Sequence, residues 1–114
     1  MESLHWFSAR CAFRHPGLPS PEGASVFEER LILLRASDPD KAITKAELEA
    51  RAYSAALELE FLGFVSVYDL EEESPGEGVE IYSVLRTCAL DPDEYVSRFL
   101  DTGTEHSQTA DDGL

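Results

Sequence analysis

The first apolar residues of the chain alternate with polar ones. In the segment Trp6–His15, every second residue from 7 to 13 is apolar, so one face of a strand would carry Phe7, Ala9, Cys11 and Phe13. This period of two is typical of a strand with one buried face. The following residues 15–25 include three prolines and two glycines, so they predict an irregular connection.

A second strand is predicted over Val26–Ala36, and its pattern changes partway. Polar residues at 28–30 are followed by four consecutive apolar residues, Leu31, Ile32, Leu33 and Leu34. Because neighbouring side chains of a strand point to opposite faces, such a run predicts cover on both faces. We therefore expect this strand to lie inside the sheet, or its second face to be covered by another layer.

A helix is predicted to begin at Asp38, because Asp38 can cap free backbone N–H groups and Pro39 suits the first helical turn. Helical spacing then unites the apolar positions Ile43, Ala46, Ala50, Tyr53 and Leu57 in one stripe. The alanines allow a close approach to a sheet. Tyr53 and Leu57 are expected to supply most of the docking energy.

The second half of the chain repeats this order. Phe61–Leu70 and Val79–Cys88 are rich in aromatic and β-branched residues and predict two more strands, and residues 91–94 predict a capped helix that ends near Leu100. That helix is expected to bury Val96, Phe99 and Leu100. The interpretation is an α+β fold with a four-stranded, largely antiparallel sheet, elements in the order β-β-α-β-β-α, and helices on one face. Residues 1–100 would form a single domain, and residues 101–114 a disordered acidic tail.

Charge narrows the classes of partner. The 114 residues carry a net charge of −14, and because residues 1–36 hold four acidic and four basic side chains, all of it comes from residues 37–114. Binding to nucleic acid or to an anionic membrane needs an excess of lysine and arginine, so neither is expected. With no apolar stretch near 20 residues and no signal-peptide pattern, the expected location is the cytoplasm. Cys11 and Cys88 are expected to be reduced and buried.

Candidate chemistry is sparse. The sequence has no phosphate-binding loop, dinucleotide fingerprint, zinc-protease motif or nucleophile elbow, and no two of its three histidines share a ligand spacing. No metal or cofactor is predicted. Glu28 or Glu29 could be a partly buried general base, but an ion pair across strands with Arg10 or Arg14 explains them without catalysis and is favoured.

The best candidate surface is the sheet face opposite the helices. Alternation is expected to display there Trp6, Arg10, Arg14, Glu80, Tyr82 and Arg86. Aromatic residues and arginines are enriched at the centres of interfaces. With Glu28 added as the candidate carboxylate, this surface favours a non-enzymatic protein-interaction module that binds a second copy or another protein. The alternatives are an enzyme or small-molecule binder that uses Glu28 or Glu29, an acidic immunity-like inhibitor of a basic protein, a structural subunit of a larger assembly, and an ordinary solvated sheet face.

Several blocks of residues resemble a bacterial family known as domain of unknown function 4288. They are Trp6-Phe7-Ser8-Ala9, residues 28–36, the alanine-rich helix around Ala46, residues 62–68, and Glu80-Ile81-Tyr82-Ser83 with Arg86. The resemblance covers roughly residues 5–100. It implies a small stand-alone bacterial domain, and it implies no catalytic residues because the family has no assigned activity.

Overall fold

The computed structural model describes residues 3–71, 74–83, 85 and 87–100. Its contacts divide the chain into two units, residues 1–83 and residues 84–114. The first unit holds β1 (His5–Arg14), β2 (Phe27–Ala36), α1 (Pro39–Leu57) and β3 (Glu60–Asp69). These four elements lie within a residue or two of the segments that the sequence predicts.

The sheet of the first unit has three antiparallel strands in the order β2-β1-β3. The α+β class is confirmed, but the prediction of four strands in the order β-β-α-β-β-α is wrong. The described residues of the expected fourth strand, 79–83, 85 and 87–88, form no strand. The composition of that segment favours a strand, but pairing with a neighbour decides whether one forms.

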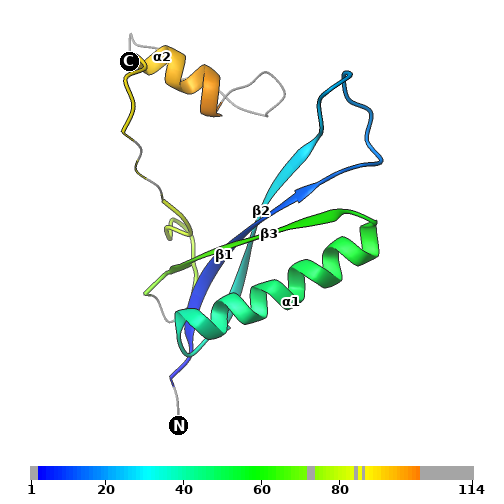
Figure 1. Ribbon diagram of the computed structural model, residues 1–114. Helices are drawn as coiled ribbons and strands as arrows, with labels where there is room; N and C mark the ends of the chain where they lie inside the picture. Colours follow the sequence, from blue (N-terminus) through cyan, green and yellow to red (C-terminus); the bar gives the residue numbers. More distant parts are fainter. Residues whose placement is uncertain (1–2, 72–73, 84, 86, 101–114) are drawn as a thin grey trace. The chain divides into compact units, whose positions relative to one another are not determined.

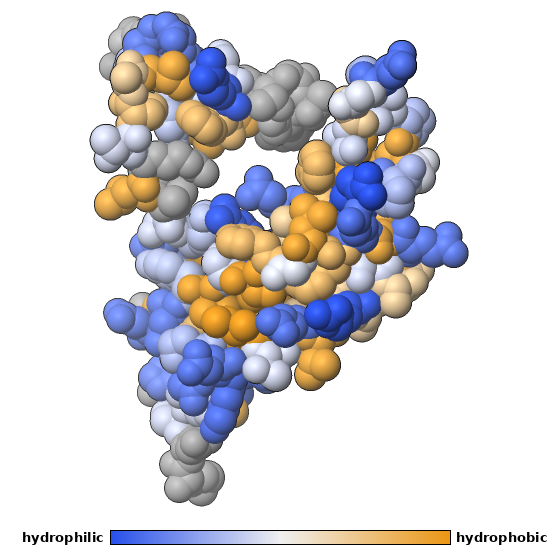
Figure 2. All heavy atoms as spheres, viewed as in Figure 1, coloured by the Kyte–Doolittle hydropathy of each residue, from blue (hydrophilic) through white to orange (hydrophobic). Residues whose placement is uncertain are grey.

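One face of the sheet packs against α1, as Figure 1 shows. β1 supplies the centre of this core, since Phe7, Ala9, Cys11 and Phe13 are each at most 3% exposed. Opposite them, Ala42, Ala46 and Ala50 of α1 are fully buried. In Figure 2, which has α1 in front, apolar side chains gather along the seam between α1 and β3. Val65 and Val67 of β3 complete the core there.

The start of α1 follows the predicted capping. Asp38 is the N-cap, and its carboxylate accepts a hydrogen bond of 2.8 Å from the backbone N–H of Lys41. The expected apolar stripe is only partly right, because the buried row runs through the three alanines and Ser54. Leu57 is 54% exposed, so it does not help to dock the helix as predicted. The small alanines bring the helix axis close to the sheet, and the contact line therefore follows them.

The second unit is described at residue 85 and over residues 87–100. It contains α2 (Pro92–Tyr95), which continues as a π-helical turn over Val96–Leu100. Asp91 caps α2 by accepting from the backbone N–H of Glu94 at 2.9 Å, as the sequence predicts. Phe99 and Leu100 are 45% and 52% exposed, so the expectation that this helix buries its apolar residues is wrong. The acidic tail, residues 101–114, lies outside the described residues. Neither described helix has the combination of length and apolar character that crossing a membrane requires.

Candidate functional site

The face of the sheet opposite α1 carries a cluster around Arg10, at the middle of the central strand. The Arg10 guanidinium carbon lies 5.0 Å from the ring centre of Tyr82 and 5.4 Å from that of Phe64, so the guanidinium contacts two aromatic rings. Its Nη1 also donates to Glu29 at 3.2 Å. Arg10 thereby ties together β1, β2, β3 and the segment that follows β3. We call this face the open face.

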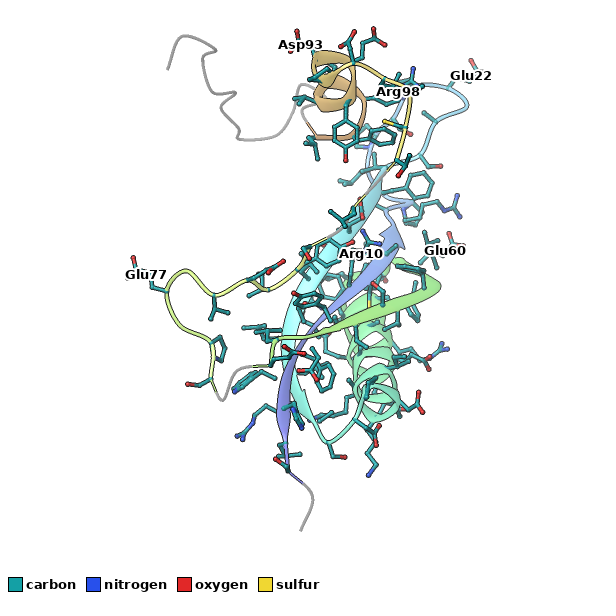
Figure 3. The ribbon with its side chains drawn as sticks, turned by 90° about the vertical axis from the view of Figure 1, so that its left-hand side faces the viewer. Arg10, Glu22, Glu60, Glu77, Asp93 and Arg98 are labelled. Carbon is teal, nitrogen blue, oxygen red and sulfur yellow. The ribbon has the colours of Figure 1, made fainter. Side chains whose placement is uncertain are left out.

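Tyr82 belongs to residues 74–83, which carry no strand or helix. Figure 3 shows this segment on the side of the sheet away from α1, with Glu77 near its tip. Tyr82 is half-buried against Arg10, whereas Glu80 is exposed. The segment therefore covers part of the open face near Arg10 and leaves most of β2 uncovered.

The uncovered part of the open face is apolar. Four large side chains at its positions are 42–63% exposed: Phe27, Leu31, Leu33 and Phe64. The register places the three residues of β2 there, because they lie opposite Arg14, Arg10 and Ser8, and residues directly opposite in an antiparallel pair share a face. Phe64 lies there because its ring contacts the Arg10 guanidinium. A bulge between Cys11 and Phe13 is accommodated by Gly63, whose φ of 81° suits glycine.

Arginines outnumber glutamates on the strands of the open face. Arg14 forms an ion pair with Glu60, and Arg35 lies over the ring of Trp6 at 5.5 Å. With Arg10 and Glu29, the strands of this face hold three arginines and two glutamates. The strands of this face are thus slightly basic in a chain whose net charge is −14.

The sequence-predicted residues therefore separate into groups. Trp6, Arg10, Arg14 and Tyr82 lie together on or against the open face, and Glu29 rather than Glu28 makes the cross-strand ion pair with Arg10. Arg86 lies outside the described residues. Sequence reasoning missed Leu31, Leu33 and Phe64 as members of the face. The alternation of the second strand contained the signal for the leucines, because Ile32 and Leu34 account for only one of its two faces.

Glu28 points to the other face of the sheet, toward α1. Its Oε1 lies 2.8 Å from Nε2 of His15, and its Oε2 accepts a hydrogen bond of 2.8 Å from the Tyr53 hydroxyl. This hydrogen bond, together with the nearby carboxylate charge, raises the pKa of Tyr53 above its ordinary value. Glu28 thus joins the β1–β2 connection, the sheet and the helix.

A second ion pair extends this cluster. Arg30 donates to both carboxylate oxygens of Glu49, at 2.8 and 2.6 Å, and its guanidinium carbon lies 3.8 Å from the ring centre of Tyr53. The nearby Cys11 thiol is buried, and burial raises its pKa. Cys88 is exposed, so the expectation that both cysteines are buried is wrong.

A shallow hollow of about 280 Å³ lies beside this cluster, lined by His15, Gly17, Leu18, Leu57, Glu58 and Leu59. Glu28 does not line it, and both carboxylate oxygens of Glu28 already accept hydrogen bonds. Across the described ranges, no three His, Cys, Asp or Glu side chains gather as metal ligands would. The arrangement gives Glu28 a structural task, since its carboxylate contacts His15 and Tyr53.

Comparison of the chain with protein-family models, with curated proteins and with solved structures finds no match.

Proposed function

We propose that this chain is a non-enzymatic protein-interaction module that associates with a second copy of itself through the open face. The observation that carries the proposal is the exposed apolar surface beside Arg10. Exposed apolar residues scattered singly are ordinary, but contiguous ones flanked by polar residues are typical of interaction sites. Aromatic and arginine side chains at its centre are the residue types that dominate binding energy at interfaces.

The charge of the open face favours a second copy over a basic partner. An inhibitor of a basic protein is expected to present acidic groups at the contact, where they would steer and hold that protein. The strands of the open face instead carry more arginines than glutamates. The strands of two such faces can therefore meet without strong repulsion, and the acidic residues Glu77 and Glu80 lie on the adjoining segment 74–83.

The size of the face suggests a modest affinity. Ten-residue strands with a rise of about 3.4 Å and a spacing of about 4.8 Å give the three-stranded sheet a projected area on the order of 500 Å². Each partner of a stable complex usually buries about 800 Å². We therefore expect self-association that depends on concentration in the micromolar range.

Sedimentation equilibrium of the purified full chain tests the proposal. The wild type should show a monomer–dimer equilibrium, and Phe64→Glu should shift it toward monomer while far-UV circular dichroism stays unchanged. Leu48→Glu is the matched control, because Leu48 is 66% exposed on α1, away from the open face. A wild-type chain that stays monomeric at several hundred micromolar would refute self-association. Equal effects of the two variants would refute the open face as its site.

A further inference from the structure

Among the described residues, no strand pairs with the outer edge of β2, whose ladder partner is β1. The backbone N–H of His15 donates to the carbonyl of Val26 at 2.8 Å where the two strands meet the loop. Bonded and non-bonded pairs alternate in an antiparallel ladder, so the even-numbered residues 28–36 bond to β1. The odd-numbered residues 27–35 direct their N–H and C=O groups outward.

These outward residues also carry the side chains of the open face. Read along β2, the row is Phe27, Glu29, Leu31, Leu33 and Arg35. Natural edge strands are usually short, bulged or heavily charged, because a long apolar edge pairs with other chains. β2 has ten residues, keeps an uninterrupted register with β1, and exposes 43% of Leu31 and 42% of Leu33. Its charged residues are at 28–30 and 35, so the apolar run 31–34 is the part of β2 that is unusual at an edge position.

We propose that β2 pairs antiparallel with β2 of a second copy, about a two-fold axis that passes by Ile32. This register places Glu29 opposite the partner's Arg35 and Leu31 opposite the partner's Leu33. The inference rests on the proposed self-association and assigns its contact to the β2 side of the open face: the two-fold axis is perpendicular to the sheet, so the two open faces lie side by side on one side of the joined sheet. Across the pair, the two three-stranded sheets join into one continuous sheet, and β2 lies in its interior.

Charge and backbone geometry together select this register. Only the odd-numbered residues have outward backbone groups, so they must pair with odd-numbered residues of the partner. An axis at Leu31 would place Glu29 opposite a leucine and Arg35 opposite Phe27, and an axis at Leu33 would place Arg35 opposite Leu31. The axis at Ile32 matches unlike charges at both ends and leucines in the middle, and opposite charges across strands are favourable.

The existing contacts of the two charged residues are compatible with the pairing. Glu29 is paired with Arg10, but 71% of its side chain is exposed, so its second oxygen is accessible. The ammonium group of Lys45 donates to the carbonyl of Arg35. A carbonyl oxygen has two lone pairs and can also accept the interchain bond.

Charge exchange tests the register in the full-length chain. Glu29→Arg and Arg35→Glu each place like charges opposite each other at both ends of the β2 pair, so each should weaken the dimer about tenfold at low salt. An equimolar mixture of the two variants should restore dimerisation, because every facing pair in the mixed dimer is again unlike. The double variant should restore it as well. Glu77→Arg is the control for the change in net charge, since Glu77 is exposed and lies off the sheet.

The outcomes separate this inference from the proposed function. If neither the mixture nor the double variant restores the dimer, the register is wrong. If the single variants dimerise like the wild type while Phe64→Glu dissociates, the β2 contact is wrong and the open face stands. If the wild type is monomeric at several hundred micromolar, both proposals fall.

Discussion

The alanine row of α1 allows a quantitative test of how the helix is packed. Ala42, Ala46 and Ala50 are 0% exposed, whereas Ala52 of the same helix is exposed. Leucine adds three carbon atoms to alanine, and alanine and leucine are both strong helix formers. Ala46→Leu and Ala52→Leu therefore change helix propensity equally and differ only in what the new side chain meets.

The expected loss of stability follows from the closed packing at Ala46. Extra methylenes in a packed core cost about 1–3 kcal/mol, because they force shifts of the backbone or unfavourable rotamers. An exposed substitution usually changes stability by less than about 0.5 kcal/mol. In a domain of this size, 1 kcal/mol lowers Tm by roughly 4–8 °C. Ala46→Leu should thus lower Tm by at least about 4 °C, and Ala52→Leu should leave it nearly unchanged.

Urea denaturation followed by far-UV circular dichroism gives the free energy of unfolding for both variants. If the free energy of unfolding falls by about 1 kcal/mol per molar urea, the urea midpoint of Ala46→Leu should be roughly 1–3 M lower than that of the wild type, at an unchanged slope. Equal midpoints for the two variants would refute the packing of α1 on the sheet through the alanine row. A changed slope for Ala46→Leu would mean that the substitution alters the compactness of the native or the unfolded state. Ala42→Leu would then replace it in the comparison.

Two further predictions concern the end of α1 and its contact with Glu28. Glu58 caps α1 in the left-handed region, with φ of 56°, and places a negative charge at the helix C-terminus. Glu58→Gly should raise stability by about 0.5–1 kcal/mol in urea titrations, because both unfavourable features disappear; no gain would contradict this backbone conformation. The hydrogen bond to Glu28 raises the pKa of Tyr53 above 10.0, so it stabilises the fold below about pH 10, and this contribution is lost as the pH rises through the raised pKa. The free energy of unfolding of the wild type should therefore fall more steeply above pH 10 than that of Tyr53→Phe. The wild-type absorbance at 295 nm minus that of Tyr53→Phe, followed against pH, reports the titration of Tyr53, and a midpoint at or below pH 10 would contradict the raised pKa.

Local patterns predict the first unit of the fold well. Alternation in β1 identifies its buried residues, and Asp38 with Pro39 fixes the start of α1. These features depend on neighbours in the sequence, so one sequence suffices to find them. The extent of the buried stripe on α1 depends on where the sheet ends, and Leu57 was therefore misplaced.

The segment 79–88 shows why strand composition alone is insufficient. Val79, Ile81 and Tyr82 suit a strand, yet a strand exists only where a neighbour supplies its backbone hydrogen bonds. In the structure Tyr82 is instead half-buried against the guanidinium of Arg10. Alternation along the predicted strand placed Tyr82 with Arg10, so Tyr82 was predicted on the correct face but in the wrong element. Side-chain chemistry and backbone pairing are separate requirements, and the sequence pattern reports mainly the first.

In β2, the apolar pattern of the sequence and the exposure seen in the structure differ. Four consecutive apolar residues, 31–34, indicate cover on both faces, but among the described residues Leu31 and Leu33 are 43% and 42% exposed, whereas Ile32 and Leu34 pack against the core. The pattern of a strand reflects all the burial it experiences, including burial by other chains, whereas the structure of one chain contains only the intramolecular part. Pairing of β2 with a second copy would give Leu31 and Leu33 a leucine neighbour along the sheet and would place β2 inside a sheet, which is one of the two arrangements that the run predicts. The sequence pattern and the edge position of β2 then agree without any change in the fold of the single chain, and rescue by mixing Glu29→Arg with Arg35→Glu decides whether this account is right.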